Sequence, residues 1–360
     1  MWKKILKRPC ARNEADKARE RLPVDLLADD DFVDHLYREL LGRDADAGGK
    51  ASHLAFLGEG HSRAALVMHF VRSPEFVFRT IRDHIHDYVK LLPIMDDRPD
   101  RYRVERSRSG AEQGRFFLAE GSEDFDWLEA KIIGNGYYER PGVWSFIIDE
   151  DKRMMAEIAA GFKPRTVLDI GCANGAVLKC LQDMGIHGEG VEISRIALDK
   201  ALPEVRDAIH LGDLLELALP RRYDLVMGLD VFEHLNPNKL DAYLARIFDL
   251  VEDNGHVFTN IPAFGADAVF GEVFKIDYAV WDKDVAAGRF FHAVPVDDYG
   301  YPKNGHLINA DSDWWTKAFA RFGFRRDVGI ERGLHETYGA EIDRIAPARR
   351  SFYVFAKPPA

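Results

Sequence analysis

From about residue 126 onward, short apolar runs alternate with amphipathic segments of helical length. This alternation predicts an α/β fold, in which connecting helices cover a mostly parallel sheet. The clearest helix spans 239–252, because its apolar residues recur every three or four positions and Asn254 and Gly255 follow it. A late apolar run at 351–356 is expected to join the same core. The strands expected before it are Thr166–Asp169, Gly188–Glu192, Ala208–Leu211, Tyr223–Gly228 and His256–Ile261.

The 360-residue length exceeds that of a usual single domain, so two domains are expected. An upstream helix is predicted over 29–41, which opens with three aspartates and is ended by Gly42. A second begins near Ser62, a favourable N-cap, and stops before Ser73. Residues 96–125 are charged and lack periodicity, which predicts a linker. We therefore expect a basic tail over 1–27, a small all-α domain over 28–95, the linker over 96–125 and the α/β domain over 126–360.

The net charge is −11 and the pI is near 5.7, which disfavours nucleic acid as a partner and favours small or uncharged substrates. Three cysteines (Cys10, Cys172 and Cys180) have no paired spacing, which is typical of a reducing compartment, so a cytoplasmic location is expected. The basic segment Met1–Arg8 lacks the apolar core of a signal peptide and is interpreted as a solvated tail. No apolar stretch reaches 18 residues, so no transmembrane segment is expected.

The strand at Thr166–Ile170 runs into a short loop that begins with Gly171 and ends with Gly175, and a helix follows. Glycines at such a turn let the backbone approach a ligand at the carboxyl edge of a sheet. A carboxylate, Asp169, stands at the strand end, where it would repel the phosphates of a dinucleotide. It suits a ligand that carries a cationic ammonium and sulfonium, as S-adenosylmethionine does. A tight turn without a ligand is the alternative.

Two further strands end in acidic residues. Glu192 lies near the spacing at which an acidic residue accepts the hydroxyls of a ribose, and Ile193 after it could pack on an adenine face. Asp213 ends the next strand and can accept from the adenine amino group, while Leu214 offers a backbone amide. Each carboxylate alone is common on protein surfaces, but the three in order predict a nucleoside site.

This ordered series resembles the class I (Rossmann-like) S-adenosylmethionine-dependent methyltransferase family over residues 126–360. The resemblance implies a seven-stranded sheet with helices on both faces and an antiparallel last strand at 351–356. It also implies that Gly171 and Gly175 line the methionine part of the cofactor; Ala173 departs from the commoner middle glycine. The residues expected to bind the cofactor are Asp169, Gly171, Cys172, Ala173, Asn174, Gly175, Glu192, Ile193, Asp213, Leu214 and Asp230.

The fourth strand ends in a segment that holds Asp230, Glu233 and His234. A helix beginning near Asp230 would place it beside both other residues. Two carboxylates and an imidazole could then bind a divalent cation or form an acid/base cluster. His306, before a helical run at 314–322, is a further candidate.

The order of these residues resembles the E-x-x-E-H element of ubiquinone-pathway O-methyltransferases and small-RNA 3′-end 2′-O-methyltransferases, with Asp230 at the first position. The resemblance implies Mg²⁺ or a similar ion held by Asp230, Glu233, His234 and His306. A similar Glu-His-Leu run orders the loop above the cofactor in many metal-free relatives, and this alternative stays open. Without metal, His234, His306 and Glu233 are the candidate catalytic residues, because a hydroxyl acceptor must lose its proton to a base.

Residues 262–305 form an insertion rich in aromatic residues. A structureless loop of this length is usually functional when it lies over a site. The aromatic side chains either build an acceptor pocket as a lid, which residues 136–145 would close from the other side, or form a satellite core. They are Phe264, Phe270, Phe274, Trp281, Phe290, Phe291, Tyr299 and Tyr301.

The N-terminal helical region holds a motif over 32–46, a Gly60-x-Ser62 pair and Ser73–Phe76. These motifs resemble the DUF4214 family and, more distantly, phycobilisome-linker repeats. The resemblance implies an interaction or positioning module with a protein partner, often attached to enzymes that build bacterial surface polysaccharides.

The predicted function is therefore O-methylation of a sugar or glycan hydroxyl in surface polysaccharide biosynthesis. One alternative is an RNA 2′-O-methyltransferase with a divalent metal, which the acidic charge disfavours and a lack of salt-sensitive RNA binding would exclude. Another is a non-catalytic scaffold with a degenerate methyltransferase fold. The intact Asp169, Gly171, Glu192 and Asp213 argue against a scaffold, and cofactor binding that Glu192→Ala weakens would exclude it.

Overall fold

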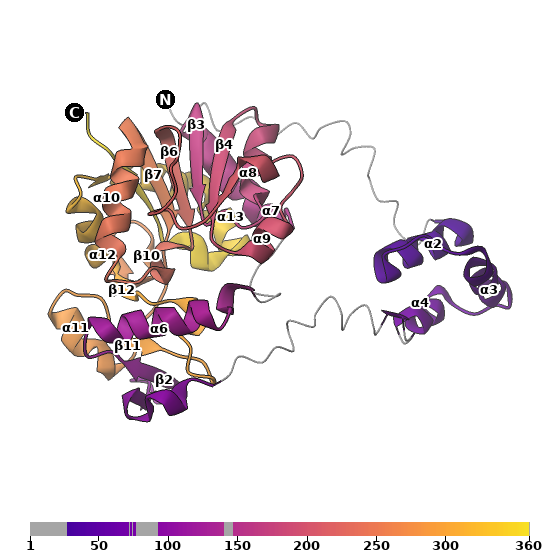
Figure 1. Cartoon of the computed structure of the whole chain (residues 1–360), viewed down its shortest axis with the longest axis horizontal. Coiled ribbons are helices and arrows are strands. Elements are labelled where there is room, and N and C mark those ends of the chain that lie inside the picture. Colours follow the sequence, from indigo (N-terminus) through magenta and orange to yellow (C-terminus); the bar gives the residue numbers. More distant parts are fainter. Residues whose placement is uncertain (1–26, 72, 74, 77–92, 140–146, 360) are drawn as a thin grey trace. The chain divides into compact units, whose positions relative to one another are not determined.

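The computed structural model describes residues 27–71, 73, 75–76, 93–139 and 147–359 (Figure 1). The chain divides into two compact units, and the boundary between them in the sequence falls between Lys90 and Leu91. Residues 1–26 of the predicted basic tail, including Cys10, lie outside the described residues. No helix in the described part is both long enough and apolar enough to cross a bilayer.

In its described residues, the N-terminal unit contains three α-helices around a small apolar core. The predicted first helix is present as α2 (Asp29–Leu36) and a π-helical turn at Tyr37–Leu41, which a left-handed Gly42 ends. The predicted second helix is α4 (Arg63–Val71), and the Ser62 hydroxyl accepts from the backbone N–H of Ala65 at 3.1 Å as an N-cap. The core comprises Phe32, Val33, Leu36, Tyr37, Leu66 and Phe70.

A further helix in this unit, α3 (Ala47–Gly58), was not predicted. Its sequence contains two early glycines and no regular apolar stripe. The helix begins at Asp46, whose side chain accepts from the backbone N–H of Gly49 at 2.8 Å. Leu54 and Leu57 pack against the unit's core, so tertiary packing supports a helix that local sequence favours only weakly.

The larger unit contains a seven-stranded sheet in the order β13-β14-β7-β6-β3-β4-β5. The pairs β5-β4, β4-β3, β3-β6 and β6-β7 are parallel, whereas β14 is antiparallel to both of its neighbours. The predicted seven-stranded sheet with an antiparallel last strand is thus confirmed. The strands are β3 (Thr166–Ile170), β4 (His187–Glu192), β5 (Ile209–Leu211), β6 (Tyr223–Leu229), β7 (Val251–Asn260), β13 (Arg325–Arg326) and β14 (Phe352–Ala356).

Helices cover both faces of this sheet (Figure 1). Side chains alternate along each strand, so Leu168 packs on one face and Val167 on the other. The first face is covered by α10 (Leu240–Leu250) and α12 (Ser312–Ala320). The second face is covered by α7 (Glu150–Gly161), α8 (Ala176–Asp183) and α13 (Val328–Ile345). The order of the strands reverses at β3, and the open side of such a reversal is where α/β sheets bind ligands.

The prediction of a linker over residues 96–125 is wrong. These residues form β1 (Tyr102–Arg106), β2 (Gln113–Leu118) and the start of α6 (Ser122–Gly134). The strand β2 pairs with β1 on one side and with β11 (Ala293–Pro295) on the other. Figure 1 shows α6, β2 and β11 grouped beneath the large sheet. Sequence periodicity missed this group because the partner of β2 comes from the distant 262–305 insertion.

The 262–305 insertion is ordered, which corrects the expectation of a structureless lid. It contains three short strands, β8 (Ala263–Phe264), β9 (Ala266–Asp267) and β10 (Gly271–Glu272), and then α11 (Asp282–Ala286) and β11. Four of the eight aromatic rings named above are buried, as in the satellite-core alternative, while Phe264, Phe274 and Phe290 are half-buried and Tyr299 is exposed. The fully buried rings are Phe270, Trp281, Phe291 and Tyr301.

Candidate active site

The three predicted acidic residues follow adjacent parallel strands, so they lie along one edge of the sheet. In the strand register, Asp169 is opposite Gly190 and Glu192 is opposite Leu211. Asp213 lies two residues beyond the end of β5. Asp169 and Glu192 are both buried, at 3% and 2% exposure. Burial removes two carboxylates from water, and hydrogen bonds or a bound cation are needed to offset the lost hydration energy.

The loop from Gly171 to Gly175 turns sharply at the end of β3. Gly171, Ala173 and Gly175 all have positive φ angles, of 69°, 50° and 78°. A Cβ atom at Gly171 would lie 2.6 Å from Cγ2 of Val231, so a side chain there would force a shift. The backbone therefore packs more closely against Val231 than any residue with a side chain would allow.

The carboxylate of Glu192 holds this loop in place. It accepts the backbone N–H of Ala173 at 2.9 Å through Oε2 and that of Ser194 at 2.8 Å through Oε1. Glu192 thus ties the β3 loop to the segment after β4. Its predicted contact with a ribose would come in addition to this structural role.

Burial raises the pKa of Asp169 to about 7, the nearby charge of Glu192 adds to the rise, and the charge of Arg349 opposes it. Burial likewise raises the pKa of the Cys172 thiol, which remains neutral. A carboxyl group balanced in this way near neutral pH gains strongly from a bound cation. The charge of Asp169 therefore suits a ligand with a positive group.

Beyond the end of β5, Asp213, the residue predicted to bind adenine, already has two hydrogen-bond partners. Its carboxylate accepts from the Tyr243 hydroxyl at 2.7 Å and from the backbone N–H of Leu215 at 2.9 Å. The side chain of Ile193 is 52% exposed, whereas that of Leu214 is buried. Ile193 therefore offers an open apolar face, while Leu214 could reach a ligand only through its backbone. Tyr243 of α10 was not predicted at this position.

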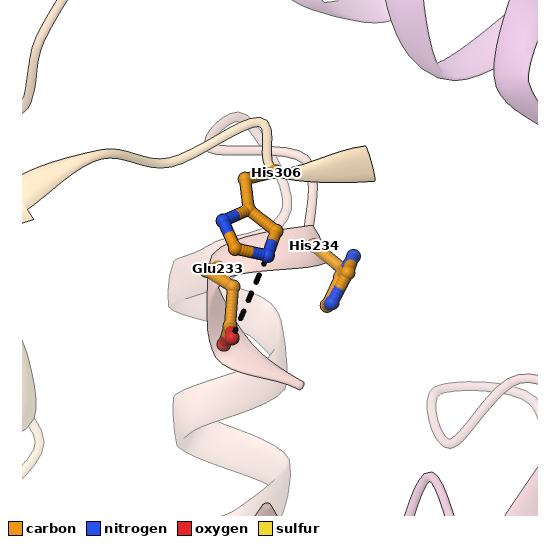
Figure 2. Close-up of side chains that lie close together, drawn as sticks. All are labelled: Glu233, His234 and His306. Atoms are coloured by element: carbon orange, nitrogen blue, oxygen red, sulfur yellow. Dashed lines mark ion pairs between the residues drawn. The ribbon is translucent and has the colours of Figure 1, made fainter. Parts of the chain in front are cut away.

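Beyond the end of β6, the structure brings Glu233, His234 and His306 together (Figure 2). One potential ligand atom from each lies within 4.8 Å of the others. Glu233 and His234 belong to the 3₁₀ turn η9 (Phe232–His234). The loop that carries His306 is fixed to this turn, because the backbone N–H groups of Leu307 and Ile308 both donate to the carbonyl oxygen of Glu233, at 2.8 and 2.9 Å.

Asp230 does not join this cluster, which corrects the predicted four-residue site. The expected α-helix does not form, because Asp230 has a left-handed φ of 55° and the 3₁₀ turn begins only at Phe232. Its carboxylate instead pairs with Nη2 of Arg349 at 2.9 Å. Arg349 was missed by the sequence analysis. It precedes β14, and because this strand is antiparallel, it enters the sheet at the edge where β6 ends.

The cluster contains a buried carboxylate without a hydrogen-bond donor. Neither oxygen of Glu233 has a hydrogen-bond partner among the residues that the structure describes, and the side chain is inaccessible to solvent. Burial, and secondarily the charge of Asp230, raise the pKa of Glu233. Burial lowers the pKa of His234 to about 4 and that of His306 to about 3, so both imidazoles are neutral at pH 7. Neutral imidazoles have a free lone pair for a proton or a metal ion.

Comparison with known families agrees with this geometry. Residues 145–327, just over half of the chain, match the family model described as a methyltransferase domain, Methyltransf_23. The chain belongs to this methyltransferase family. The predicted membership in the class I S-adenosylmethionine-dependent methyltransferases is thereby confirmed. Residues 16–80 match DUF4214, a domain of unknown function, as the N-terminal motifs predicted.

Two curated relatives of this methyltransferase are named ubiquinone biosynthesis O-methyltransferase. The protein from Nitrosomonas europaea is 28% identical over 110 residues, and that from Proteus mirabilis is 29% identical over 110 residues. Each alignment covers 28% of this chain and 46% or 44% of the relative, so the chain matches slightly less than half the length of either protein.

Similar solved structures include the CcbJ methyltransferase from Streptomyces caelestis, with 18% identity and a TM-score of 0.38, covering 63% of this chain and 96% of that one. DesVI from Streptomyces venezuelae has 19% identity and a TM-score of 0.38, covering 64% and 98%.

In this methyltransferase, Tyr138 connects the segment after β4 to the histidine cluster. Its hydroxyl lies 3.2 Å from Nδ1 of His234, and its carbonyl oxygen accepts from the Ser194 hydroxyl at 3.2 Å. Tyr138 belongs to the predicted pocket-closing segment 136–145, of which residues 140–145 lie outside the described residues. The hydroxyl of Tyr138 thus orients His234 next to Glu233.

Proposed function

We propose that this chain transfers a methyl group from S-adenosylmethionine to a hydroxyl oxygen. The observation that carries the proposal is the buried cluster of Glu233, His234 and His306 beyond β6, next to the acidic nucleoside edge. When bound, S-adenosylmethionine supplies an electrophilic methyl group on a sulfonium. The names of the two curated O-methyltransferases support oxygen as the acceptor atom.

The edge of the sheet that carries Asp169, Glu192 and Asp213, which we call the nucleoside edge, fits this cofactor. The close backbone turn at Gly171 leaves no room for a side chain, and the buried Asp169 would gain from the positive charge of the cofactor. Glu192 would hold the ribose, and Ile193 would cover the adenine. Calorimetry with S-adenosylhomocysteine tests this part: we expect binding to the unmodified protein and weaker binding to Glu192→Ala. No binding to the unmodified protein would contradict the proposal.

The two histidines are the proposed proton acceptors. Both are neutral at pH 7, and a hydroxyl oxygen needs to lose its proton as it attacks. The proposal places the ring proton of His234 on Nδ1, where it faces the hydroxyl oxygen of Tyr138 at 3.2 Å, so that Nε2 keeps the lone pair that accepts the proton. His306 is held beside it by the backbone bonds of the following residues to Glu233.

The same cluster fits a divalent metal ion, which we include in the proposal. Within the described part of the chain, the buried carboxylate of Glu233 has no hydrogen-bond donor, and its ligand atom and those of the two neutral imidazoles lie within 4.8 Å of one another. Two nitrogen ligands and one carboxylate suit Mn²⁺, Fe²⁺ or Zn²⁺ better than Mg²⁺, which prefers oxygen ligands. Such an ion would polarise the acceptor oxygen, and the two histidines would then serve as its ligands.

For the acceptor, we propose a hydroxyl of a sugar or glycan intermediate of surface polysaccharide synthesis in the cytoplasm. The DUF4214 match supports this choice, because that module resembles those attached to polysaccharide-building enzymes, and it would bind a protein partner there. Incubation with methyl-labelled cofactor and pools of nucleotide sugars and glycans tests the acceptor class. We expect label in the carbohydrate fraction, and label found only in lipid quinones or in RNA would contradict it.

A further inference from the structure

Arg349 places a cation at the same edge of the sheet as the buried carboxylates of this methyltransferase. It lies in the turn Pro347–Arg350 directly before β14. Phe352, the first residue of β14, pairs with Asn260, the last residue of β7. The turn is therefore at the carboxyl edge of the parallel strands, where the cofactor would lie.

Only some of the N–H donors of the Arg349 guanidinium have partners among the described residues. Its Nε forms an ion pair with Asp151 at 2.9 Å, and its Nη2 forms one with Asp230 at 2.9 Å. Its Nη1 is buried and has no hydrogen-bond partner among the described residues. The whole side chain is 16% exposed. A buried guanidinium donor without an acceptor is costly, and an anionic ligand is the partner that such a donor recognises best.

The surrounding charges define which ligand group fits there. Arg349 pairs with Asp230 at 2.9 Å, and its charge also opposes the rise in pKa that burial causes at Asp169. These carboxylates favour the ammonium and sulfonium of S-adenosylmethionine, but they would repel its carboxylate. Lys152 is another cation in this region, and its Nζ donates to Asp151 at 3.1 Å.

We propose that Nη1 of Arg349 binds a carboxylate, and that this group is the α-carboxylate of S-adenosylmethionine. The inference rests on the proposed cofactor. Arg349 would then divide its donors among Asp151, Asp230 and the ligand, and would couple α7, β6 and β14 at the methionine end of the pocket. A carboxylate on the acceptor has the same chemistry and is the other source of such a group.

The test compares two ligands that differ in one group. S-adenosylhomocysteine carries the α-carboxylate, and its decarboxylated analogue, 5′-deoxy-5′-(3-aminopropylthio)adenosine, keeps the ammonium but lacks the carboxylate. We expect calorimetry on the full chain to show at least about tenfold tighter binding of S-adenosylhomocysteine. In Arg349→Gln we expect this ratio to fall to about two or below, and in Arg349→Lys to an intermediate value. The ratio is internal to each variant, so a general loss of stability does not mimic the effect.

Arg350 provides the matched control. It is the next residue, but its Nη1 pairs with Asp343 at 2.9 Å, and its side chain is 40% exposed. Arg350→Gln should keep the full ratio. An unchanged ratio in Arg349→Gln, or no preference in the unmodified protein, would overturn the inference and leave the proposed methyl transfer intact. Binding of neither ligand to the unmodified protein would overturn both.

A second experiment distinguishes a carboxylate of the cofactor from a carboxylate of the acceptor. It measures methyl transfer to acidic and to neutral glycans. If Arg349→Gln kept the cofactor ratio but lost transfer to acidic glycans alone, the carboxylate would belong to the acceptor. That outcome would overturn the cofactor assignment.

Discussion

Nε2 of His306 lies 3.9 Å from Oε1 of Glu233, although the two residues are separated by α10, β7 and the whole 262–305 insertion. Their approach depends on the backbone bonds from Leu307 and Ile308 to the carbonyl of Glu233. A charged pair would be costly here, since both pKa shifts favour the neutral forms. The site is therefore arranged to receive a proton or a cation rather than to hold an ion pair.

Substitution of Glu233 by Gln tests the cation. In the presence of a chelator, we expect Glu233→Gln to unfold at a temperature no lower than the unmodified protein, because an amide replaces a buried carboxyl group without a donor. With Mn²⁺ or Zn²⁺ at about a hundred times its Kd, the unmodified protein should gain about 2.7 kcal/mol and the variant far less. Thermal unfolding measures both. A metal-independent unfolding temperature in the unmodified protein would speak against a metal site.

Removal of either imidazole should slow methyl transfer without preventing cofactor binding. We expect His234→Ala and His306→Ala to lose about 10²- to 10⁴-fold in rate, the usual contribution of a positioned base. Tyr138→Phe should lose less, because only the group that orients His234 is removed. Initial rates at saturating cofactor measure these losses. His187→Ala, at the exposed start of β4, is the control and should keep the full rate.

Cofactor affinity should depend on pH through Asp169. Its pKa is about 7 in the free protein, so the carboxyl group is mostly protonated at pH 6 and mostly charged at pH 8. A bound ammonium favours the charged form, so affinity for S-adenosylhomocysteine should rise across this range with release of a proton. Calorimetry in buffers of different ionisation enthalpy detects that proton. Asp169→Asn should bind more weakly at pH 8 and lose most of the pH dependence; an equal slope in the variant would refute the assignment.

The same shift predicts the stability of the ligand-free protein. The folded-state pKa of Asp169 lies above the unfolded value, so its stabilising contribution is complete at low pH and is lost as the pH rises through about 7. Relative to the unmodified protein, Asp169→Asn should therefore become more stable as the pH increases from 5 to 8. Urea unfolding at several pH values measures this difference, and a constant difference would contradict it.

The glycine loop allows a comparison between crowding and backbone strain. Gly171 and Gly185 both have positive φ angles, but a Cβ atom would meet Val231 at Gly171 and nothing within 4 Å at Gly185. Gly185→Ala should cost about 1–2 kcal/mol from the left-handed backbone alone. Gly171→Ala should cost about 1–3 kcal/mol more because of the clash, and should weaken cofactor binding. Chemical unfolding measures the costs; equal costs would show that the loop adapts.

The parts of the fold that were predicted correctly depend on local sequence. The strands β3 and β6 consist largely of apolar residues, and Asp169 and Glu192 lie at the ends of β3 and β4, where the sequence placed them. The antiparallel last strand was expected from the family resemblance. The helix α10 is visible in the sequence because all its buried residues fall on one stripe.

The parts that were missed depend on contacts between distant segments. Phe117 looked like part of a linker because its neighbours Val294 and Leu307 come from the insertion and the loop after it. Asp230 was predicted to lie in a helix from its spacing to Glu233 and His234. That spacing does not reveal the left-handed backbone conformation of Asp230, which prevents a helix from starting there. Arg349 carried no motif, and only the direction of β14 brings it to the site.

The pairing of β2 with β11 has a consequence for synthesis of the chain. During translation, the hairpin of β1 and β2 emerges early, but its second neighbour emerges only after most of the large sheet has been made. Until then, the open edge of β2 and its phenylalanines remain uncovered, which is the situation in which nascent chains aggregate or recruit chaperones. Truncated products that end before Ala293 should therefore be insoluble, even though they contain every strand of the nucleoside edge.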